Sequence, residues 1–243
     1  PDAIVFVPVD YKALVTTVEK MNKAGIPVFN YCNEMAGGKY KIYVGSDDER
    51  LAYELAMYMF KKIGGKGNVI VQDGVPGAIT AQMRHKGFIK AIEETPGIKL
   101  LTAQPANYNR LKGMQVMENL LQRFPKIDLV LAANDEQGLG AIEAIDAAGR
   151  LKEIKVTGID ANYDAAQSIQ QGRLYASADY AGLHQGYLAT KAAIKYLRGE
   201  KIPKRIILPV LIVDKANAKE YSVPFETRKL LDYDEMSKKY GVW

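Results

Sequence analysis

Polar and aromatic side chains gather where predicted strands end. Asn134 and Asp135 follow one apolar strand and Asp160 follows the next, while Tyr31 and Tyr180 come at the ends of two others. Amides and carboxylates beside flat aromatic rings are suited to orient a small polar ligand and to pack against it. The plainer alternative is that the three polar residues cap helices and that the tyrosines are ordinary half-buried aromatics.

The loops that carry these residues share one position in the predicted fold. In parallel sheets, ligands bind at the carboxyl ends of the strands, where loops and helix N-termini converge. Eight loops meet this description, and several are rich in Asn, Asp and Tyr: residues 8–11, 31–35, 45–48, 73–79, 104–108, 133–137, 160–163 and 179–183.

Catalytic and metal-binding patterns are missing from the sequence. The two histidines, His85 and His184, lie far apart and lack metal-ligand spacing, and there is no G-x-S-x-G, P-loop or strand-linked G-x-G-x-x-G motif. The Asp47-Asp48 pair is better explained as helix-start charge, and the single cysteine, Cys32, as an inert filler. We therefore expect no enzymatic activity, no metal and no cofactor.

The composition is that of an ordinary globular protein. Of 243 residues, 48% are hydrophobic and 25% are charged, and no apolar run approaches the roughly 20 residues of a membrane helix. The net charge is +5, yet the basic residues are scattered over helix ends and turns rather than forming a stripe. This distribution argues against specific nucleic-acid binding.

Strands and helices alternate along the chain, which predicts an α/β fold with doubly wound parallel sheets. The predicted strands are 3–8, 26–31, 41–45, 68–72, 98–103, 129–133, 155–159, 174–178 and 206–213. The predicted helices are 11–23, 47–62, 78–94, 108–123, 136–148, 161–171 and 183–198. The series opens inside a β-α-β unit, so we expect a preceding segment or a partner strand to cover the edge of the 3–8 strand.

Five segments, in order, resemble the ribose-binding-protein-like type I periplasmic sugar-binding proteins. They are VPVDYKALVTTVEKMNKAGIPV (7–28), GGKGNVIVQDGVPG (64–77), PANYNRLKGMQVMENLL (105–121), AANDEQGLGAIEAI (132–145) and VTGIDANYDAAQSIQQGRLYAS (156–177). The resemblance implies two lobes joined by three crossovers, with a small ligand in the cleft between them. It also implies a periplasmic or extracellular location, an ABC transporter permease as partner, and an N-terminal lobe that lacks the family's first elements.

The resemblance also assigns candidate ligand residues. Asn134, Asp160 and Tyr108 match the family's cleft Asn, Asp and stacking aromatic. Elsewhere the chain departs from the family: it has Cys32-Asn33 in place of an Asp-Arg pair, Gln82 in place of an Arg, and Tyr180 in place of a Gln. The predicted ligand residues are Tyr31, Asn33, Gln82, Tyr108, Asn134, Asp160 and Tyr180. Because neither position holds an arginine, we expect a sugar-like or less hydroxylated polar ligand rather than simple ribose or galactose.

The same resemblance predicts how the chain divides. Residues 1–46 with 181–204 are expected to form the N-terminal lobe, residues 47–180 with 205–214 the C-terminal lobe, and 215–243 a tail packed on the lobes. Hinges are expected near 45–47, 179–182 and 201–204. Ligand binding would then favour a closed form, because both lobes contact the ligand only when closed.

The expected function is a solute-binding protein that delivers its ligand to an ABC transporter. The alternative is the effector-binding domain of a LacI-type regulator or a sensor receptor, since these share the fold. A signal peptide upstream would indicate transport, and a helix-turn-helix would indicate repression.

Overall fold

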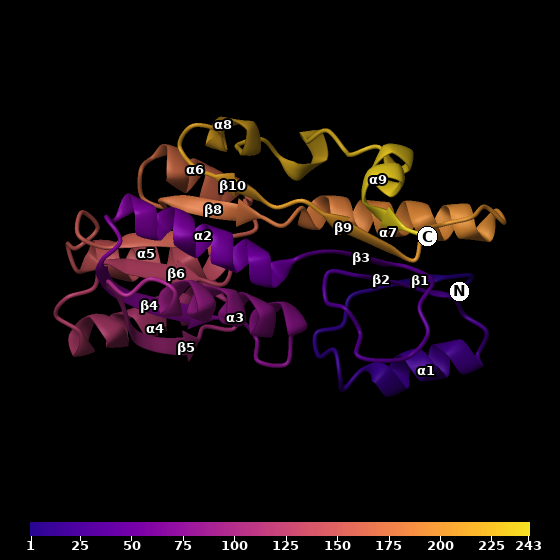
Figure 1. Cartoon of the computed structure of the whole chain (residues 1–243), viewed down its shortest axis with the longest axis horizontal. Helices are drawn as coiled ribbons and strands as arrows, with labels where there is room; N and C mark the ends of the chain where they lie inside the picture. The colour runs from indigo at the N-terminus through magenta and orange to yellow at the C-terminus, as the bar shows by residue number, and fades with distance from the viewer.

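The computed structural model describes residues 1–243, except for the side chain of Glu226. Two α/β lobes lie side by side along the long axis of the molecule (Figure 1). Each lobe is built on its own sheet, and nearly all strand pairs are parallel. The predicted α/β fold with two doubly wound lobes is therefore confirmed.

The N-terminal lobe has a five-stranded sheet in the order β1-β2-β3-β9-β11. Its strands are β1 (Ile4–Phe6), β2 (Val28–Tyr31), β3 (Tyr43–Ser46), β9 (Arg205–Leu208) and β11 (Gly241–Val242). Helix α1 (Val15–Lys23) lies on one side of the sheet and α7 (Gly182–Leu197) on the other (Figure 1). β1 is an edge strand, paired only with β2 among the described residues.

The C-terminal lobe has a six-stranded sheet in the order β10-β8-β7-β6-β4-β5. Its strands are β4 (Gly67–Asp73), β5 (Ile98–Pro105), β6 (Leu129–Ala132), β7 (Lys155–Ile159), β8 (Ala176–Asp179) and β10 (Leu211–Val213). Its main helices are α2 (Asp48–Lys62), α3 (Ile79–Glu93), α4 (Arg110–Arg123), α5 (Asp135–Ala147) and α6 (Tyr163–Gln170).

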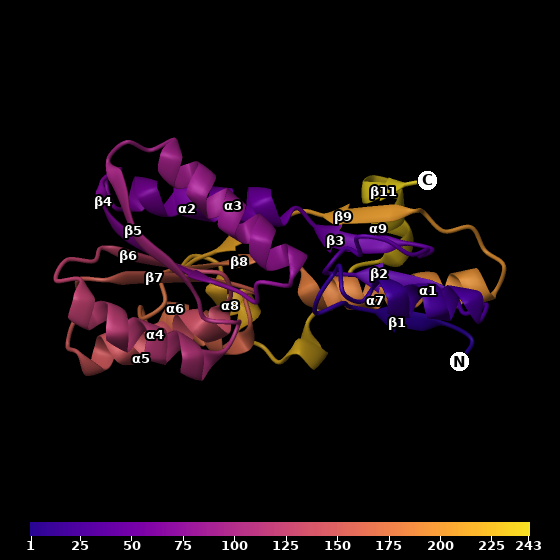
Figure 2. The same ribbon diagram turned by 90° about the horizontal axis from the view of Figure 1, so that it is seen from below.

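These helices cover both faces of the C-terminal sheet (Figure 2), and the alternation of side chains along the strands explains why. Val69 and Val71 of β4 belong to the core under α2 and α3, whereas Ile70 points into the core under α4, α5 and α6. All three side chains are fully buried. The apolar β4 strand therefore requires helices on both faces, as its sequence predicts.

Three connections join the lobes. The chain passes from β3 to α2 at Asp47, from β8 to α7 at Tyr180 and Ala181, and from β9 to β10 at Pro209 and Val210. The prediction of one strand over 206–213 is wrong: β9 pairs with β3 in the N-terminal sheet, whereas β10 pairs with β8 in the other. Pro209 lacks an N–H, so it interrupts strand pairing at the point where the chain changes sheets.

This division also changes the predicted lobe boundaries. Residues 205–208 were expected in the C-terminal lobe, but they form a strand of the N-terminal sheet. The expected hinge at 201–204 accordingly lies within the N-terminal lobe, in the connection from α7 to β9. The crossover itself follows at residues 209–210, because the pairing of β9 with β3 extends through Leu208.

The tail crosses from one lobe to the other. Helix α8 (Ala218–Tyr221) packs against α6, and α9 (Tyr233–Tyr240) packs against β9. Strand β11 then pairs antiparallel with β9. A short 3-10 helix, η1 (Phe225–Thr227), lies between α8 and α9. The tail is thus an ordered segment anchored on both lobes (Figure 1).

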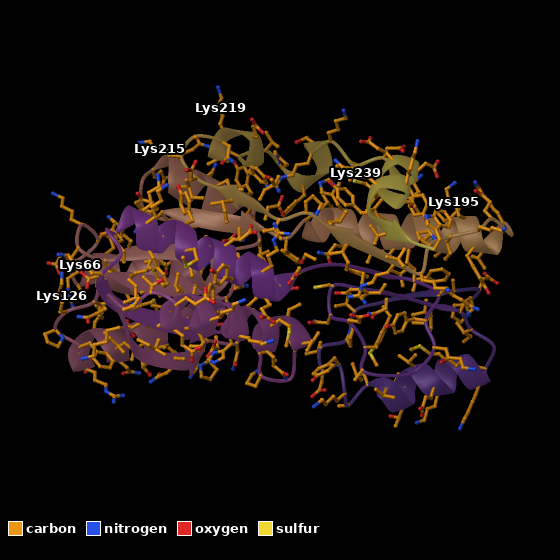
Figure 3. The ribbon with its side chains drawn as sticks, in the orientation of Figure 1. Lys66, Lys126, Lys195, Lys215, Lys219 and Lys239 are labelled. Atoms are coloured by element: carbon orange, nitrogen blue, oxygen red, sulfur yellow. The ribbon has the colours of Figure 1, made fainter. Side chains whose placement is uncertain are left out.

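The basic residues are dispersed over the surface. In Figure 3, Lys66 and Lys126 lie at the outer end of the C-terminal lobe, while Lys195 and Lys239 lie on the other lobe. Several are paired: Lys126 with Asp128, and Lys195 with Glu200. Among the described residues, no helix is both long and apolar enough to span a membrane.

The close contact between α4 and α5 generates a test of the fold. A Cβ at Gly140 would overlap the carbonyl oxygen of Arg110. We expect Gly140→Ala to lower the free energy of unfolding by roughly 1–3 kcal/mol, because the helices must separate. Gly186→Ala in α7 is the matched control, since its Cβ would meet the Tyr31 ring at an ordinary 3.4 Å. Urea denaturation of both variants decides the point, and equal stabilities would contradict the packing argument.

Candidate functional site

A buried arginine lies at the end of the C-terminal lobe that faces the other lobe. Arg84, on α3, is only 3% exposed. Its Nε donates to Asp48 Oδ1 at 2.7 Å, and its Nη1 donates to the carbonyl oxygen of Ala133 at 2.8 Å. Asp160 Oδ1 lies 3.9 Å from Nη1. Arg84 therefore joins the first residue of α2, the end of β6 and the turn after β7.

Two aromatic rings enclose the same guanidinium. The Arg84 Cζ atom lies 4.9 Å from the ring centroid of Tyr180 and 5.8 Å from that of Tyr108. Both distances are within the range of cation–π attraction. The result is a cluster of one cation, two carboxylates and two aromatic rings, hereafter the Arg84 cluster (Asp48, Arg84, Tyr108, Asp160 and Tyr180).

Burial and charge shift the protonation of this cluster. Burial by itself would lower the pKa of Arg84, but Asp48, Tyr108 and Asp160 raise it well above its ordinary value, so the guanidinium remains charged. Burial raises the pKa of Asp160, and the nearby Asp135 carboxylate raises it further, while Arg84 acts in the opposite direction. The charge on Asp160 is therefore sensitive to whatever occupies the space beside it.

The two predicted residues of the N-terminal lobe differ in what they contact. Asn33 is buried, and its Oδ1 accepts a hydrogen bond from the backbone N–H of Thr80 at 3.2 Å. Tyr31 is half-buried, with its ring against Gly186 of α7. Asn33 thus bridges the two lobes directly, whereas Tyr31 packs within its own lobe.

The predicted residues of the C-terminal side lie mostly in or beside the cluster. Tyr108 and Tyr180 flank Arg84, and the Tyr108 hydroxyl lies 3.2 Å from Thr80 Oγ1. Asn134 is buried and caps α5, because its Oδ1 accepts from the N–H of Gln137 at 3.0 Å. The plainer role considered for Asn134 is therefore real, and its side-chain nitrogen has no hydrogen-bond partner among the described residues.

Gln82 differs from the other predicted residues. It is exposed, and its side chain donates to the carbonyl oxygen of Pro76 at 2.9 Å. The buried position on α3 belongs instead to Arg84, which the sequence-based assignment missed. Helical periodicity carries the signal, since Arg84 shares one face of α3 with buried Ala81 and Phe88 at spacings of three and four residues.

Strained backbone concentrates around the cluster. Six non-glycine residues of the described chain have positive φ angles, and they lie at the ends of strands that face the other lobe or at the crossover: Cys32, Asn107, Tyr108, Asp160, Ala161 and Ala181. Such conformations persist where the surroundings fix them, and they are common at binding sites. They also explain why α4 and α6 begin two residues later than predicted, at Arg110 and Tyr163.

Two cavities adjoin the cluster. One of about 420 Å³ is lined by Cys32, Asp48 and Thr80, and one of about 240 Å³ is lined by Asp160, Tyr180 and Phe225, among others. Burial raises the pKa of the Cys32 thiol to about 12, which disfavours the nucleophilic thiolate form. Among the described residues, no group of three or more His, Cys, Asp or Glu is arranged to hold a metal ion.

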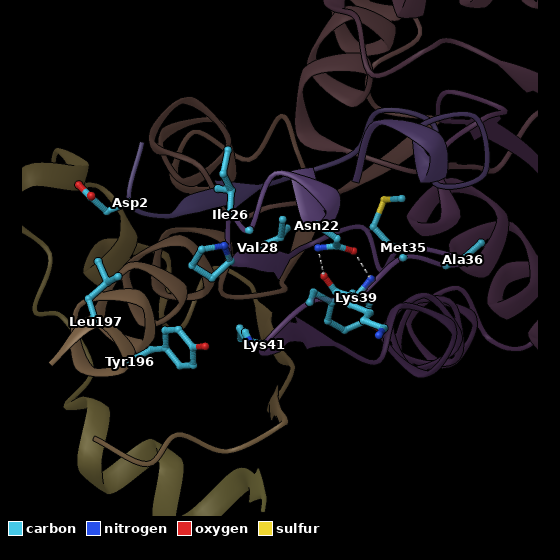
Figure 4. Close-up of a pocket in the computed structure, with 15 residues that line it drawn as sticks. Asp2, Asn22, Ile26, Val28, Met35, Ala36, Lys39, Lys41, Tyr196 and Leu197 are labelled. Atoms are coloured by element: carbon cyan, nitrogen blue, oxygen red, sulfur yellow. Dashed lines mark hydrogen bonds between the residues drawn. The ribbon is translucent and has the colours of Figure 1, made fainter. Parts of the chain in front are cut away.

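A larger cavity, of about 840 Å³, lies between α1 and the end of α7 (Figure 4). Several of its polar groups are already paired: Nδ2 and Oδ1 of Asn22 both bond to the backbone of Lys39, and Lys41 lies over the Tyr196 ring. The described lining includes none of the seven predicted residues. A ligand site needs convergent free polar groups, so the interlobe cluster is the better candidate.

Asp135, whose carboxylate raises the pKa of Asp160 in the cluster, provides a test of the electrostatics of this region. Its fully buried carboxylate accepts from Ser177 Oγ at 2.6 Å and from the N–H of Asn162 at 2.9 Å, and burial raises its pKa to about 7. Because this value exceeds that of the unfolded chain, the folded protein binds more protons between about pH 4 and 7. The contribution of Asp135 to stability therefore falls as the pH rises through this window.

We expect Asp135→Asn to remove that loss. Between pH 5 and 7 the unfolding free energy of the original protein should fall by roughly 2 kcal/mol relative to the variant. Chemical denaturation at pH 5, 6 and 7 measures the difference. Asp146→Asn, an exposed site, serves as control and should follow the original profile. Parallel profiles for Asp135→Asn and the original protein would show that Asp135 is already ionised at pH 5.

Comparisons with known proteins identify the family to which the two-lobe fold belongs. Residues 1–201 match a family model described as a periplasmic binding protein domain. The ribose import binding protein of Bacillus subtilis is 38% identical over 209 residues, which cover 86% of this chain and 67% of that protein.

Two similar solved structures are also ligand-binding proteins. One is a solute-binding protein of an ABC transporter from Bacillus halodurans, with bound myo-inositol. It superposes with a TM-score of 0.86 at 32% identity, and the matched region covers 91% of this chain and 77% of that protein. A fructose-binding periplasmic domain of a hybrid two-component system has a TM-score of 0.85 at 30% identity, covering 91% and 74%. The relatives are binding proteins rather than enzymes, and this chain belongs to the periplasmic binding protein family.

Proposed function

We propose that this protein captures a small polyhydroxylated ligand, a sugar or a cyclitol, between its lobes outside the cytoplasm and delivers it to an ABC transporter permease. The observation that carries the proposal is the Arg84 cluster, where charged and aromatic groups from five separate loops and helices face the other lobe. The ligands named for the relatives, ribose, myo-inositol and fructose, belong to this class.

The chemistry of the cluster suits hydroxyl groups. Arg84 Nη2 has no hydrogen-bond partner among the described residues, and the Asp160 carboxylate accepts no hydrogen bond from them. A sugar hydroxyl both donates and accepts, so one hydroxyl can join these two groups. The faces of Tyr108 and Tyr180 supply apolar surface for ring C–H groups.

The buried arginine changes the expected ligand. The preference for a less hydroxylated molecule assumed that no arginine remained at the site, with Gln82 in its place. Arg84 supplies a charged donor in the buried position, which favours a ligand with several hydroxyls. The departures at Cys32 and Tyr180 still distinguish this site from that of a simple ribose binder.

Lobe closure follows from the three crossovers. Asn33 joins the two lobes through Thr80 in this structure, so a ligand held by Arg84 and Asp160 would lose contact with the Asn33 loop if the lobes separated. Because these contacts exist only in the closed form, binding shifts the population toward it. The closed form is then the one that a permease would recognise.

The experiment is calorimetric titration with D-ribose, myo-inositol and D-fructose, using the original protein, Asp160→Asn and Asp160→Ala. We expect at least one of the three to bind, and either substitution to weaken its binding more than about tenfold through loss of a charged hydrogen-bond partner. Asp146→Asn, far from the cluster, should leave affinity unchanged. Binding that survives Asp160→Ala would remove Asp160 from the site, and no binding to any of the three would refute the ligand class.

A sensor function is the second candidate, because one structural neighbour is the periplasmic domain of a two-component system. Both functions use the same closure, but they differ in what recognises the closed form. Stimulation of the ATPase of a reconstituted sugar-import permease by the liganded protein would support delivery. A liganded protein that stimulates no such permease yet binds a receptor ectodomain would support sensing.

A further inference from the structure

The C-terminal segment (residues 214–243) reaches the Arg84 cluster from outside both sheets. It leaves β10, packs α8 against α6, passes the crossovers and ends in β11 on the N-terminal sheet (Figure 1). At its midpoint lies Arg228, a half-buried residue between η1 and α9.

Arg228 is held in a fixed orientation by two aromatic rings. Its Cζ atom lies 4.4 Å from the ring centroid of Phe225 and 5.2 Å from that of Tyr221. Its Nη2 donates to two carbonyl oxygens, that of Tyr221 at 2.7 Å and that of Ala161 at 3.1 Å. One guanidinium nitrogen thus connects the C-terminal segment to the turn that follows Asp160.

That turn is strained. Asp160 has a φ of 133° and Ala161 a φ of 51°, both in the region that favours glycine. Within the C-terminal lobe, Ala161 N donates to Ser177 Oγ at 3.0 Å and Asn162 N donates to Asp135. The Ala161 carbonyl oxygen is held from outside, by Arg228. A strained turn keeps its shape only where the surroundings fix it on more than one side.

A second contact reaches the crossover beside Tyr180. The Tyr221 hydroxyl donates to Asp179 Oδ2 at 3.1 Å, while Asp179 Oδ1 accepts from the N–H of Ala181. Two bonds from the C-terminal segment therefore end on residues adjacent to Asp160 and Tyr180, both of which flank Arg84. Phe225 of the same segment also lines the 240 Å³ cavity that Asp160 and Tyr180 line.

We propose that Arg228 is a positioning residue of the ligand site: it holds the Asp160–Ala161 turn in its strained conformation and thereby sets the affinity for ligand without touching it. The proposal rests on the proposed function, because it assumes that Asp160 contacts the ligand. It makes the C-terminal segment part of the binding apparatus. Tyr221 acts in the same direction through Asp179, and Phe225 fixes the guanidinium plane.

The first measurement needs no ligand. Hydrogen exchange of the amides of Ala161 and Asn162 reports how often the turn opens. We expect Arg228→Ala to raise the exchange rate of these amides by about tenfold, the effect of losing one charged hydrogen bond. Lys229→Ala, at the exposed neighbouring residue, is the matched control and should leave the exchange rate unchanged. A general rise across both lobes, or no change at the turn, would overturn the proposal.

The second measurement is calorimetric affinity for myo-inositol, D-ribose and D-fructose with the same variants. Arg228→Ala should weaken binding about tenfold, matching the change in exchange. Arg228→Lys should recover part of the loss, since it keeps the charge but lacks the planar guanidinium that packs against the rings of Phe225 and Tyr221. Faster exchange with unchanged affinity would also overturn the proposal.

Two further results are distinguished: a variant that does not fold, and an original protein that binds none of the three sugars. If Arg228→Ala does not fold, Tyr221→Phe removes only the bond to Asp179, and it should raise exchange at the crossover amide of Ala181 and weaken binding. If the original protein binds none of the three sugars, the proposed function fails, while the exchange result still decides whether Arg228 holds the turn.

Discussion

The buried charge of Arg84 is the constraint on which the site depends. A guanidinium removed from water must be paired, and losing one partner of such a pair typically costs about 3–5 kcal/mol. Asp48 and the Ala133 carbonyl satisfy it, so the start of α2 and the end of β6 must meet α3 at one point. Because Asp48 directly follows the first crossover, the same pair also fixes where the chain enters the C-terminal lobe.

The surrounding fold converts this constraint into a surface that faces the other lobe. Alternating side chains of β4 pack against helices on both faces of the sheet. The carboxyl ends of the strands therefore remain as the place where polar groups can gather. Left-handed turns at Tyr108 and Asp160 then direct their side chains toward Arg84 rather than along the helices that follow. The helices and strands thus fix the strained turns, and these turns position the polar and aromatic side chains of the site.

The lobes are coupled at more than their crossovers. Asn33 accepts a hydrogen bond from the N–H of Thr80, and the Thr80 hydroxyl lies beside the Tyr108 hydroxyl. These contacts connect the N-terminal lobe to an aromatic ring of the cluster. On the opposite side the C-terminal segment contacts both lobes through α8 and β11. In the proposed function, binding and closure therefore depend on residues distant in sequence from Asp160.

The sequence by itself determined the alternation of strands and helices, the α/β class, the two-lobe family architecture, and the loops in which Tyr108, Asp160 and Tyr180 lie. These follow from local patterns of apolar side chains and from the order of the motifs, both of which can be read directly from the sequence. Only the tertiary structure decided that Arg84 pairs with Asp48 and the Ala133 carbonyl, that residues 206–213 divide between two sheets, and that Arg228 reaches the turn after Asp160. Each of these depends on which distant carbonyl or carboxylate lies opposite a side chain, and such pairings are set by packing between elements rather than by local sequence.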